Sequence, residues 1–134
     1  MEPLVAVRGS CLCGGVEFEV RGEFTPRSFC HCTSCKRISG GVGTANARAR
    51  SDEINVVKGR ELLTTYQPSE GSAKTFCSVC GSNLFGGGWP EREYVSVRLP
   101  AIDEPLEGRP TQHIFMRSVA PWETLPDDGL TRQD

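Results

Sequence analysis

Near its beginning the chain reads Cys11-Leu12-Cys13-Gly14-Gly15-Val16-Glu17-Phe18-Glu19-Val20. The last five residues alternate between apolar and acidic, which is the pattern of a strand with one buried face. Side chains of an extended segment alternate between two sides, so the two cysteines point to the same side. The two glycines that follow let the backbone pass close to whatever the thiols bind. We therefore expect two convergent thiols at the start of a half-buried strand.

The remaining cysteines form two more close groups, Cys30-His31-Cys32-Thr33-Ser34-Cys35 and Cys77-Ser78-Val79-Cys80. In a Cys-x-x-Cys loop the backbone folds back, so that both sulfurs face one ion. Gly81 directly after the second group can take the left-handed conformation that completes such a turn. Seven cysteines are an odd number, which does not suit a complete set of disulfides.

The spacings favour a set of four thiols and a set of three. A complete tetrahedral set, typical of structural zinc, would consist of Cys11, Cys13, Cys77 and Cys80. Cys30, Cys32 and Cys35 can converge on a second zinc whose fourth position stays open for water or substrate. Spacing alone leaves two alternatives, since His113 could close the second set and the cysteine groups could pair differently. His31 is interpreted as a spacer whose ring points away from the metal.

The length of 134 residues fits one domain over 1–134, with a core at about 9–122 and a frayed polar tail at 127–134. The first residues lack the basic and apolar regions of an export signal, so we expect a cytoplasmic protein with reduced thiols. No segment is apolar enough to span a membrane. The formal net charge is −2, and no run of Lys or Arg is present. Nucleic acid is therefore not an expected partner.

Alternating and β-branched segments dominate the rest of the chain. They predict strands at 54–57, 62–66 and 94–99, and a further one at 113–116. Only 34–38 favours a short helical turn, with Thr33 or Ser34 as its cap. Trp89 and Trp122 are interpreted as packing residues. The fold class expected from these patterns is mainly β, with very little helix.

Four motifs occur in a characteristic order along the chain. They are Gly9-Ser10-Cys11-Leu12-Cys13-Gly14-Gly15, Phe29-Cys30-His31-Cys32-x-x-Cys35-Lys36, Phe76-Cys77-x-x-Cys80-Gly81-Ser82 and His113-Ile114-Phe115-x-x-Ser118-x-Ala120-Pro121-Trp122. This order resembles the family of the glutathione-dependent formaldehyde-activating enzymes, which also includes centromere protein V. The likeness spans about 9–122. Lys36 stands where arginine is common in the family.

The resemblance implies a β-tent fold of small coiled antiparallel β-sheets, stabilised by zinc. It implies two zinc ions per chain, a structural one on Cys11, Cys13, Cys77 and Cys80 and a catalytic one on Cys30, Cys32 and Cys35. The activity implied is that of a carbon–sulfur lyase, which forms or breaks S-hydroxymethylglutathione. Its partners would be a small thiol, glutathione or a similar one, and a small aldehyde such as formaldehyde.

An open zinc site with three thiolates has a net negative charge, so binding of a thiol suits it as well as polarisation of a carbonyl. Lys36 and Arg37 follow the last ligand and could offset this charge or bind a substrate carboxylate; two solvated cations are the alternative. No residue is identified as a general base. Besides the lyase, the sequence allows a non-catalytic zinc-binding module for protein interaction, or a thiol redox protein.

Overall fold

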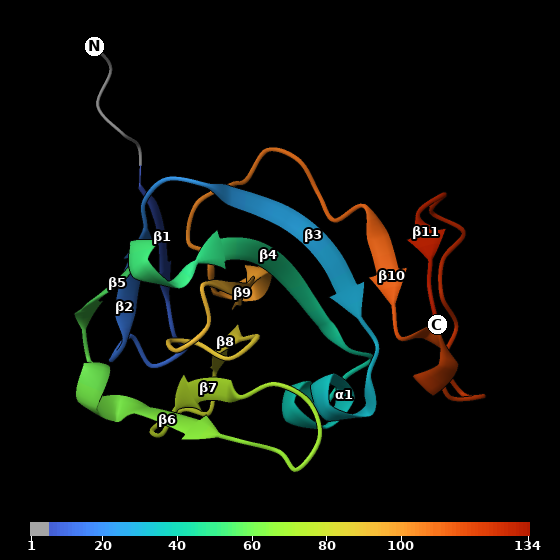
Figure 1. Ribbon diagram of the computed structural model, residues 1–134, viewed down its shortest axis with the longest axis horizontal. Helices are drawn as coiled ribbons and strands as arrows, with labels where there is room; N and C mark the ends of the chain where they lie inside the picture. Colours follow the sequence, from blue (N-terminus) through green and yellow to red (C-terminus); the bar gives the residue numbers. More distant parts are fainter. Residues whose placement is uncertain (1–5) are drawn as a thin grey trace.

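The computed structural model describes residues 6–134, in which strands form two sheets and α1 (Thr33–Ser39) is the one α-helix (Figure 1). The mainly β fold expected from the sequence is confirmed. The smaller sheet contains β1 (Val7–Ser10), β2 (Glu17–Val20) and β5 (Ile54–Lys58). The larger sheet contains β3 (Phe24–Cys30), β4 (Thr44–Arg50), β6 (Leu63–Tyr66), β7 (Lys74–Cys77), β8 (Asn83–Gly86), β9 (Tyr94–Arg98), β10 (Gln112–Ile114) and β11 (Thr131–Arg132).

The larger sheet has the order β11-β10-β3-β4-β9-β8-β7-β6, and the smaller one has the order β1-β2-β5. The long strands β3 and β4 run side by side and curve across the molecule (Figure 1). Most neighbouring strands are antiparallel, as expected, but β10 pairs in parallel with both β3 and β11. Short 3-10 helices connect several strands, at Ser51–Glu53, Arg60–Leu62, Leu99–Ala101 and Met116–Ser118.

The core is built from the inward side chains of both sheets. Val16, Phe18 and Val20, the apolar members of the alternating stretch, are at most 1% exposed. The Phe18 ring meets that of Phe85 edge to face, with ring centroids 4.9 Å apart. Phe85 packs in turn against Trp89, which is 5% exposed. The alternation at the start of the chain therefore joins the smaller sheet to the larger one.

Several details differ from the sequence expectations. The predicted strands correspond to β2, β5, β6, β9 and the shorter β10. The sequence does not predict the other strands, which are the central β3 and β4 as well as β1, β7, β8 and β11. The cap of α1 is Cys32, not Thr33 or Ser34, because the Cys32 sulfur accepts the backbone N–H of Cys35 at 3.3 Å. The 127–134 segment includes β11, which pairs with β10 where the sequence favours a frayed tail.

The second tryptophan is not a core residue. Trp122 is 70% exposed, and its ring lies 5.3 Å from the Lys36 Nζ. Its interpretation as a packing residue is therefore wrong. Within residues 6–134 no helix combines the length and the apolar character that crossing a bilayer requires.

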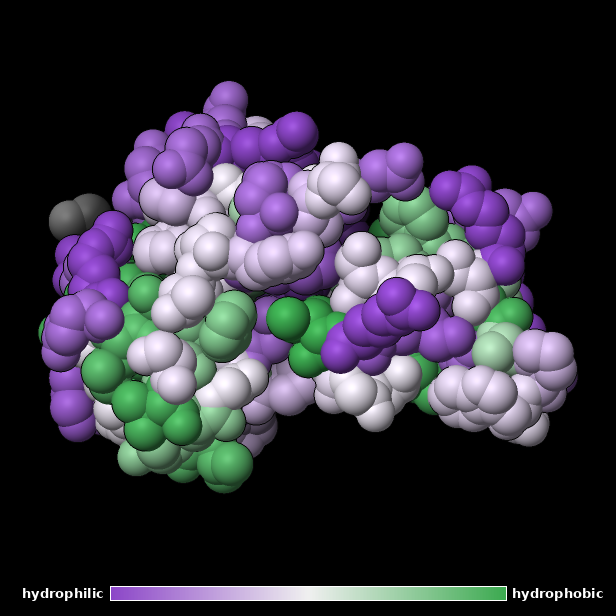
Figure 2. All heavy atoms as spheres, turned by 90° about the horizontal axis from the view of Figure 1, so that it is seen from below, coloured by the Kyte–Doolittle hydropathy of each residue, from purple (hydrophilic) through white to green (hydrophobic). Residues whose placement is uncertain are grey.

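The surface exposes some large apolar residues at the turns that carry cysteines. Leu12, between Cys11 and Cys13, is 88% exposed, and Val79, between Cys77 and Cys80, is 66% exposed. When the cysteines of such a turn point inward, the residue between them points outward. In the view from below, apolar surface is most extensive at the lower left, at the end of the molecule that carries β5 and β6, and smaller apolar patches lie among polar residues over the rest of this face (Figure 2).

Candidate metal centres

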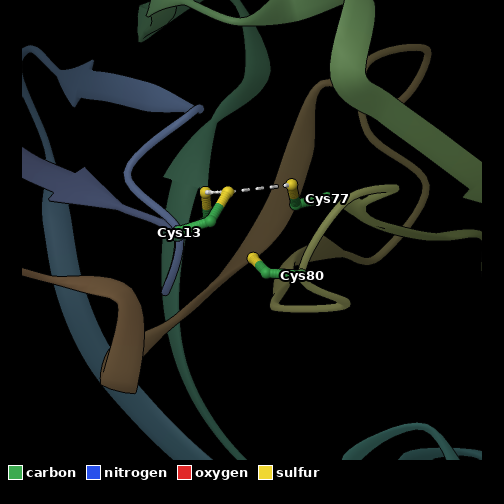
Figure 3. A group of neighbouring side chains, drawn as sticks. Cys13, Cys77 and Cys80 are labelled. Atoms are coloured by element: carbon green, nitrogen blue, oxygen red, sulfur yellow. Dashed lines mark hydrogen bonds between the residues drawn. The ribbon is translucent and has the colours of Figure 1, made fainter.

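The first candidate centre joins two turns that are distant in sequence. Cys11 and Cys13 lie between β1 and β2, whereas Cys77 ends β7 and Cys80 lies in the turn before β8. The four sulfurs lie within 4.8 Å of one another, and the sulfurs of Cys13, Cys77 and Cys80 point into one space (Figure 3). This set is the four-cysteine cluster, with the membership expected from spacing.

The geometry of the four-cysteine cluster fits a tetrahedral metal ion. The sulfurs of Cys11 and Cys13 are 3.6 Å apart, and those of Cys13 and Cys77 are 3.9 Å apart. Sulfurs bound tetrahedrally at about 2.3 Å from zinc would be ~3.8 Å apart. Soft thiolate donors in this geometry are typical of zinc. The residues present therefore fit the metal that the sequence implies.

Hydrogen bonds favour the thiolate form of Cys11 and Cys80. The pKa of Cys13 is instead raised to about 11, because the Gly15 N–H lowers it by less than the neighbouring thiols and burial raise it. The Val16 N–H donates to the Cys11 sulfur at 3.2 Å, and the Gly15 N–H donates to the Cys13 sulfur at 3.4 Å. Hydrogen bonding with the Ser82 hydroxyl, 3.2 Å from the sulfur, is the main cause that lowers the pKa of Cys80 to about 5. Donors that stabilise thiolates also support metal binding, because the metal replaces the thiol proton.

The second candidate centre, the cysteine triad, consists of Cys30 at the end of β3, Cys32 before α1, and Cys35 within α1. Their sulfurs also lie within 4.8 Å of one another. Hydrogen bonds from Cys30, and then from Cys32, lower the pKa of Cys35 to about 2. The pKa of Cys30 is raised, mainly through its hydrogen bond with Cys32. Two thiols that donate to one thiolate form a compact site in which a divalent cation can replace the protons.

The triad lies on the polar face of the central strands. Across β3 and β4, Cys30 pairs with Thr44 and Ser28 pairs with Asn46; across β4 and β9, Asn46 pairs with Arg98. Paired residues and alternate residues share a face of a sheet, so all these side chains lie on one side. The other side carries the core residues Ala47, Ala49, Val95 and Val97.

Arg98 is a buried cation beside the triad that the sequence analysis missed. It is only 5% exposed, and its guanidinium donates to the side chains of Asn83, Asn46 and Thr44. Burial lowers the pKa of Arg98, whereas the nearby charges of the triad cysteines raise it. Within residues 6–134 no carboxylate forms an ion pair with Arg98. The negative charge of the triad, first of all the Cys35 thiolate, is therefore its countercharge.

Lys36 does not offset the negative charge of the triad by direct contact, because its ammonium is engaged elsewhere. The Lys36 ammonium bonds to the buried Glu123 carboxylate and, at 3.0 Å, to the Ser118 carbonyl. Its side chain is 15% exposed, so it is neither solvated nor available to a substrate carboxylate. Arg37 is exposed. In the sequence, Arg98 was indistinguishable from a basic residue on a solvated strand face.

The ring of His31 points away from the triad, as expected, into a chain of hydrogen bonds. Its Nδ1 lies 2.9 Å from the Val42 carbonyl, and its Nε2 lies 2.8 Å from Nδ1 of His113. Nε2 of His113 lies 2.8 Å from the Asp128 carboxylate. Both nitrogens of His113 are thus engaged, so the alternative in which His113 closes the triad is wrong. This histidine chain fixes the segment that carries the triad.

A cleft of about 500 Å³ opens over the triad, and we call it the triad cleft. The three cysteines and the basic residues Lys74, Arg98 and Arg117 line it, and so does Glu70. Lys74 is 5% exposed, and its ammonium donates to the Ser72 carbonyl at 3.2 Å. A second cleft of about 530 Å³ lies beside the four-cysteine cluster, but it lacks the triad thiols. The triad cleft is therefore the candidate active site.

Comparisons with known proteins identify the family of this chain. The model of a family described as "Glutathione-dependent formaldehyde-activating enzyme" matches residues 6–118. A Halomonas elongata protein named "Putative glutathione-dependent formaldehyde-activating enzyme" is 32% identical over 125 residues, 87% of this chain and 78% of that protein. The crystal structure of a Rhodobacter sphaeroides protein matches with a TM-score of 0.59 at 28% identity, covering 95% of this chain and 99% of the other. The chain therefore belongs to the family of the glutathione-dependent formaldehyde-activating enzymes.

Proposed function

We propose that this protein is a zinc-dependent carbon–sulfur lyase that forms and breaks a thiol–aldehyde adduct such as S-hydroxymethylglutathione. The observation that supports this most is the convergence of three thiols at the floor of a cleft lined by basic residues. Membership of the family supports the same activity. The protein would act in the reducing cytoplasm, where both sets of cysteines keep their thiols.

We assign a structural zinc to the four-cysteine cluster and a catalytic zinc to the triad. Four thiolates leave no position for a substrate, whereas three leave one. Bound in the triad, zinc would lower the pKa of a coordinated thiol and could polarise a carbonyl oxygen. The Arg98 guanidinium would balance the negative charge that three thiolates and a divalent ion leave in the site.

The residues of the cleft would bind and orient the two reactants. In the synthetic direction a carbon–sulfur bond forms as the thiol sulfur attacks the aldehyde carbon, and the thiol proton ends on the aldehyde oxygen. Lys74 uses one of its three donors on Ser72, so its ammonium can also hold an anionic oxygen in the cleft. Positioning two small reactants side by side is the main task, because the uncatalysed addition is already facile.

Exchange spectroscopy by NMR tests this function. Glutathione, formaldehyde and their adduct are held at equilibrium, and the exchange rate is measured with and without zinc-loaded protein. We expect the protein to increase the exchange rate and Cys35→Ser to abolish the increase. Cys13→Ser removes a ligand of the four-cysteine cluster instead, so it shows how much of a lost rate comes from a folding defect rather than from loss of the triad. An exchange rate equal to the spontaneous one, with both metal sites loaded, would refute the lyase.

One observation supports a second function, in thiol redox chemistry. The Cys35 thiolate lies beside the Cys30 and Cys32 thiols, and a low pKa is typical of reactive cysteines. Without metal, two triad thiols could reduce a small disulfide, so that one disulfide forms in the protein and two thiols are released. Retention of zinc in the triad at physiological free-zinc concentrations would exclude this function, because coordination holds all three thiolates.

A further inference from the structure

The triad cleft continues along the sheet into a second hollow. That hollow measures about 290 Å³ and shares part of its lining with the triad cleft. The shared lining residues are Ser28, Asn46, Gly87, Ser96 and Ile114. Its far end is formed by Arg27, Arg48 and Tyr94. We call the two hollows together the polar groove.

Strand register explains why the groove is polar over its whole length. Asn46 and Arg48 alternate on β4, and their partners on β9 are Arg98 and Ser96. All four lie on the face that carries Cys30. From Thr44, which pairs with Cys30, to Arg48 is four residues along β4, or roughly 13 Å. The groove thus leads from the triad thiols to a pair of guanidinium groups.

The far end of the groove carries the guanidinium groups of Arg27 and Arg48, which suit an anion. The Arg48 guanidinium lies over the Tyr94 ring, 3.8 Å from its centroid, which restricts the orientation of the side chain. In the part of the chain that the structure describes, neither Arg27 nor Arg48 forms an ion pair. Arg50, two residues further on the same strand, pairs with Asp52, Glu53 and Glu93.

The charge of the groove is opposite to that of the whole chain. Its lining contains five basic residues, Arg27, Arg48, Lys74, Arg98 and Arg117, which outnumber its negative groups, Glu70 and the negatively charged triad. The net charge of the chain is −2. Cationic residues that converge in a groove of an acidic protein favour an anionic ligand. Two guanidinium groups are well suited to a carboxylate, which they can bind in a bidentate manner.

We propose that Arg48 and Arg27 form a carboxylate subsite that selects thiols whose carboxylate lies far from the sulfur. The proposal deepens the proposed function and rests on it for the place of the sulfur at the triad. A free cysteine carries its carboxylate only a few bonds from the sulfur, so it cannot reach both ends of the groove. A peptide thiol of the size of glutathione can span them. Arg48 is then a specificity residue, remote from the reacting atoms.

The experiment measures binding of S-methylglutathione to the zinc-loaded protein by calorimetry, in parallel with its dimethyl ester, which lacks both carboxylates. We expect Arg48→Gln to weaken binding of the acid at least about tenfold, as for loss of a charge-assisted hydrogen bond, and to leave binding of the ester unchanged. Arg27→Gln, at an exposed position, should do the same to a smaller extent. Arg21→Gln is the control, because Arg21 is paired with Glu19 and lines neither hollow of the groove.

Equal affinity of wild type and both groove variants for the acid would overturn the subsite, as would failure of the wild type to bind S-methylglutathione. The lyase is judged separately from the exchange rate of the formaldehyde adduct. If the wild type and Arg48→Gln accelerate exchange equally at low glutathione concentration, the lyase stands and the subsite falls. If Arg48→Gln loses binding while the wild type accelerates nothing, the subsite stands and the lyase falls.

Discussion

Gly86 lies directly against Arg98, so that a Cβ atom at position 86 would overlap the Arg98 guanidinium. The two residues belong to the neighbouring strands β8 and β9. The absence of a side chain at Gly86 therefore leaves room for the buried cation beside the triad. Glycine usually weakens a strand, and at the end of β8 this close approach of Arg98 explains its presence.

Gly86→Ala is expected to displace Arg98 and to weaken metal binding in the triad by about 10–100-fold, as for other residues that support metal ligands. The four-cysteine cluster should keep its metal. Chelator competition that resolves a weak and a tight zinc ion measures both effects. Gly41→Ala is the control, since a Cβ there meets only the Ser39 hydroxyl oxygen at 3.7 Å. Equal zinc affinities in the two variants would contradict the role of Gly86.

Two replacements of Arg98 distinguish the effect of its charge from the effect of its hydrogen bonds. Arg98→Met should lose triad zinc and destabilise the fold, because each buried acceptor that it leaves unpaired costs about 1–3 kcal/mol. Arg98→Lys keeps the charge without the planar guanidinium, so it should retain more zinc than Arg98→Met. Zinc content and urea unfolding give the two quantities. If Arg98→Lys and Arg98→Met lost equal amounts of zinc, the positive charge of Arg98 would not be the cause of zinc retention in the triad.

The pair of Lys36 and Glu123 should make stability depend on pH. The hydrogen bond from Lys36, followed by that from the Ala120 N–H, lowers the pKa of Glu123 below its usual 4.5. A lowered pKa in the folded state means that stabilisation is complete above the unfolded value and is lost as the pH falls towards the folded value. The free-energy difference between wild type and Glu123→Gln should therefore shrink as the pH falls below about 4.5.

This difference is measured by urea unfolding at several pH values with metal-free protein in both cases. A carbon-13 titration of the Glu123 carboxyl by NMR gives its pKa directly. Lys36→Met should raise that pKa, because the main cause of the shift is then absent. An unchanged Glu123 pKa in Lys36→Met would show that the contact with Lys36 does not hold the carboxylate.

The histidine chain is expected to carry three ring protons. Its ends, the Val42 carbonyl and the Asp128 carboxylate, can only accept, so its three hydrogen bonds need three protons, whereas two neutral rings carry two. The hydrogen bond with His113 lowers the pKa of Asp128, which is therefore ionised at neutral pH. Nitrogen-15 spectra of the two histidines should show three protonated ring nitrogens, and only two in Asp128→Asn. Two neutral rings in the wild type would contradict the hydrogen-bond pattern.

Sequence spacing predicts the cysteine clusters well, because cysteines a few residues apart can bind one ion whatever the rest of the fold is. It did not predict the cations around the triad, because Lys74, Arg98 and Arg48 look like solvated residues until β-sheet register places them on one face. β3 and β4 were missed for a related reason. Pro26 lies within β3, where a proline argues against a strand assignment, and one face of β4 carries three alanines, Ala45, Ala47 and Ala49, whose hydrophobic signal is weak. Only the assembled sheet identifies these two strands as its centre.

The most direct test of the two-centre account is the zinc content per chain of protein purified without chelator, compared with that of Cys32→Ser. Two zinc ions in the wild type and one in the folded variant are expected, because Cys32 belongs to the triad and not to the four-cysteine cluster. About one zinc ion in both proteins would contradict the account, since the triad would then hold no metal and the lyase would lose its catalytic centre.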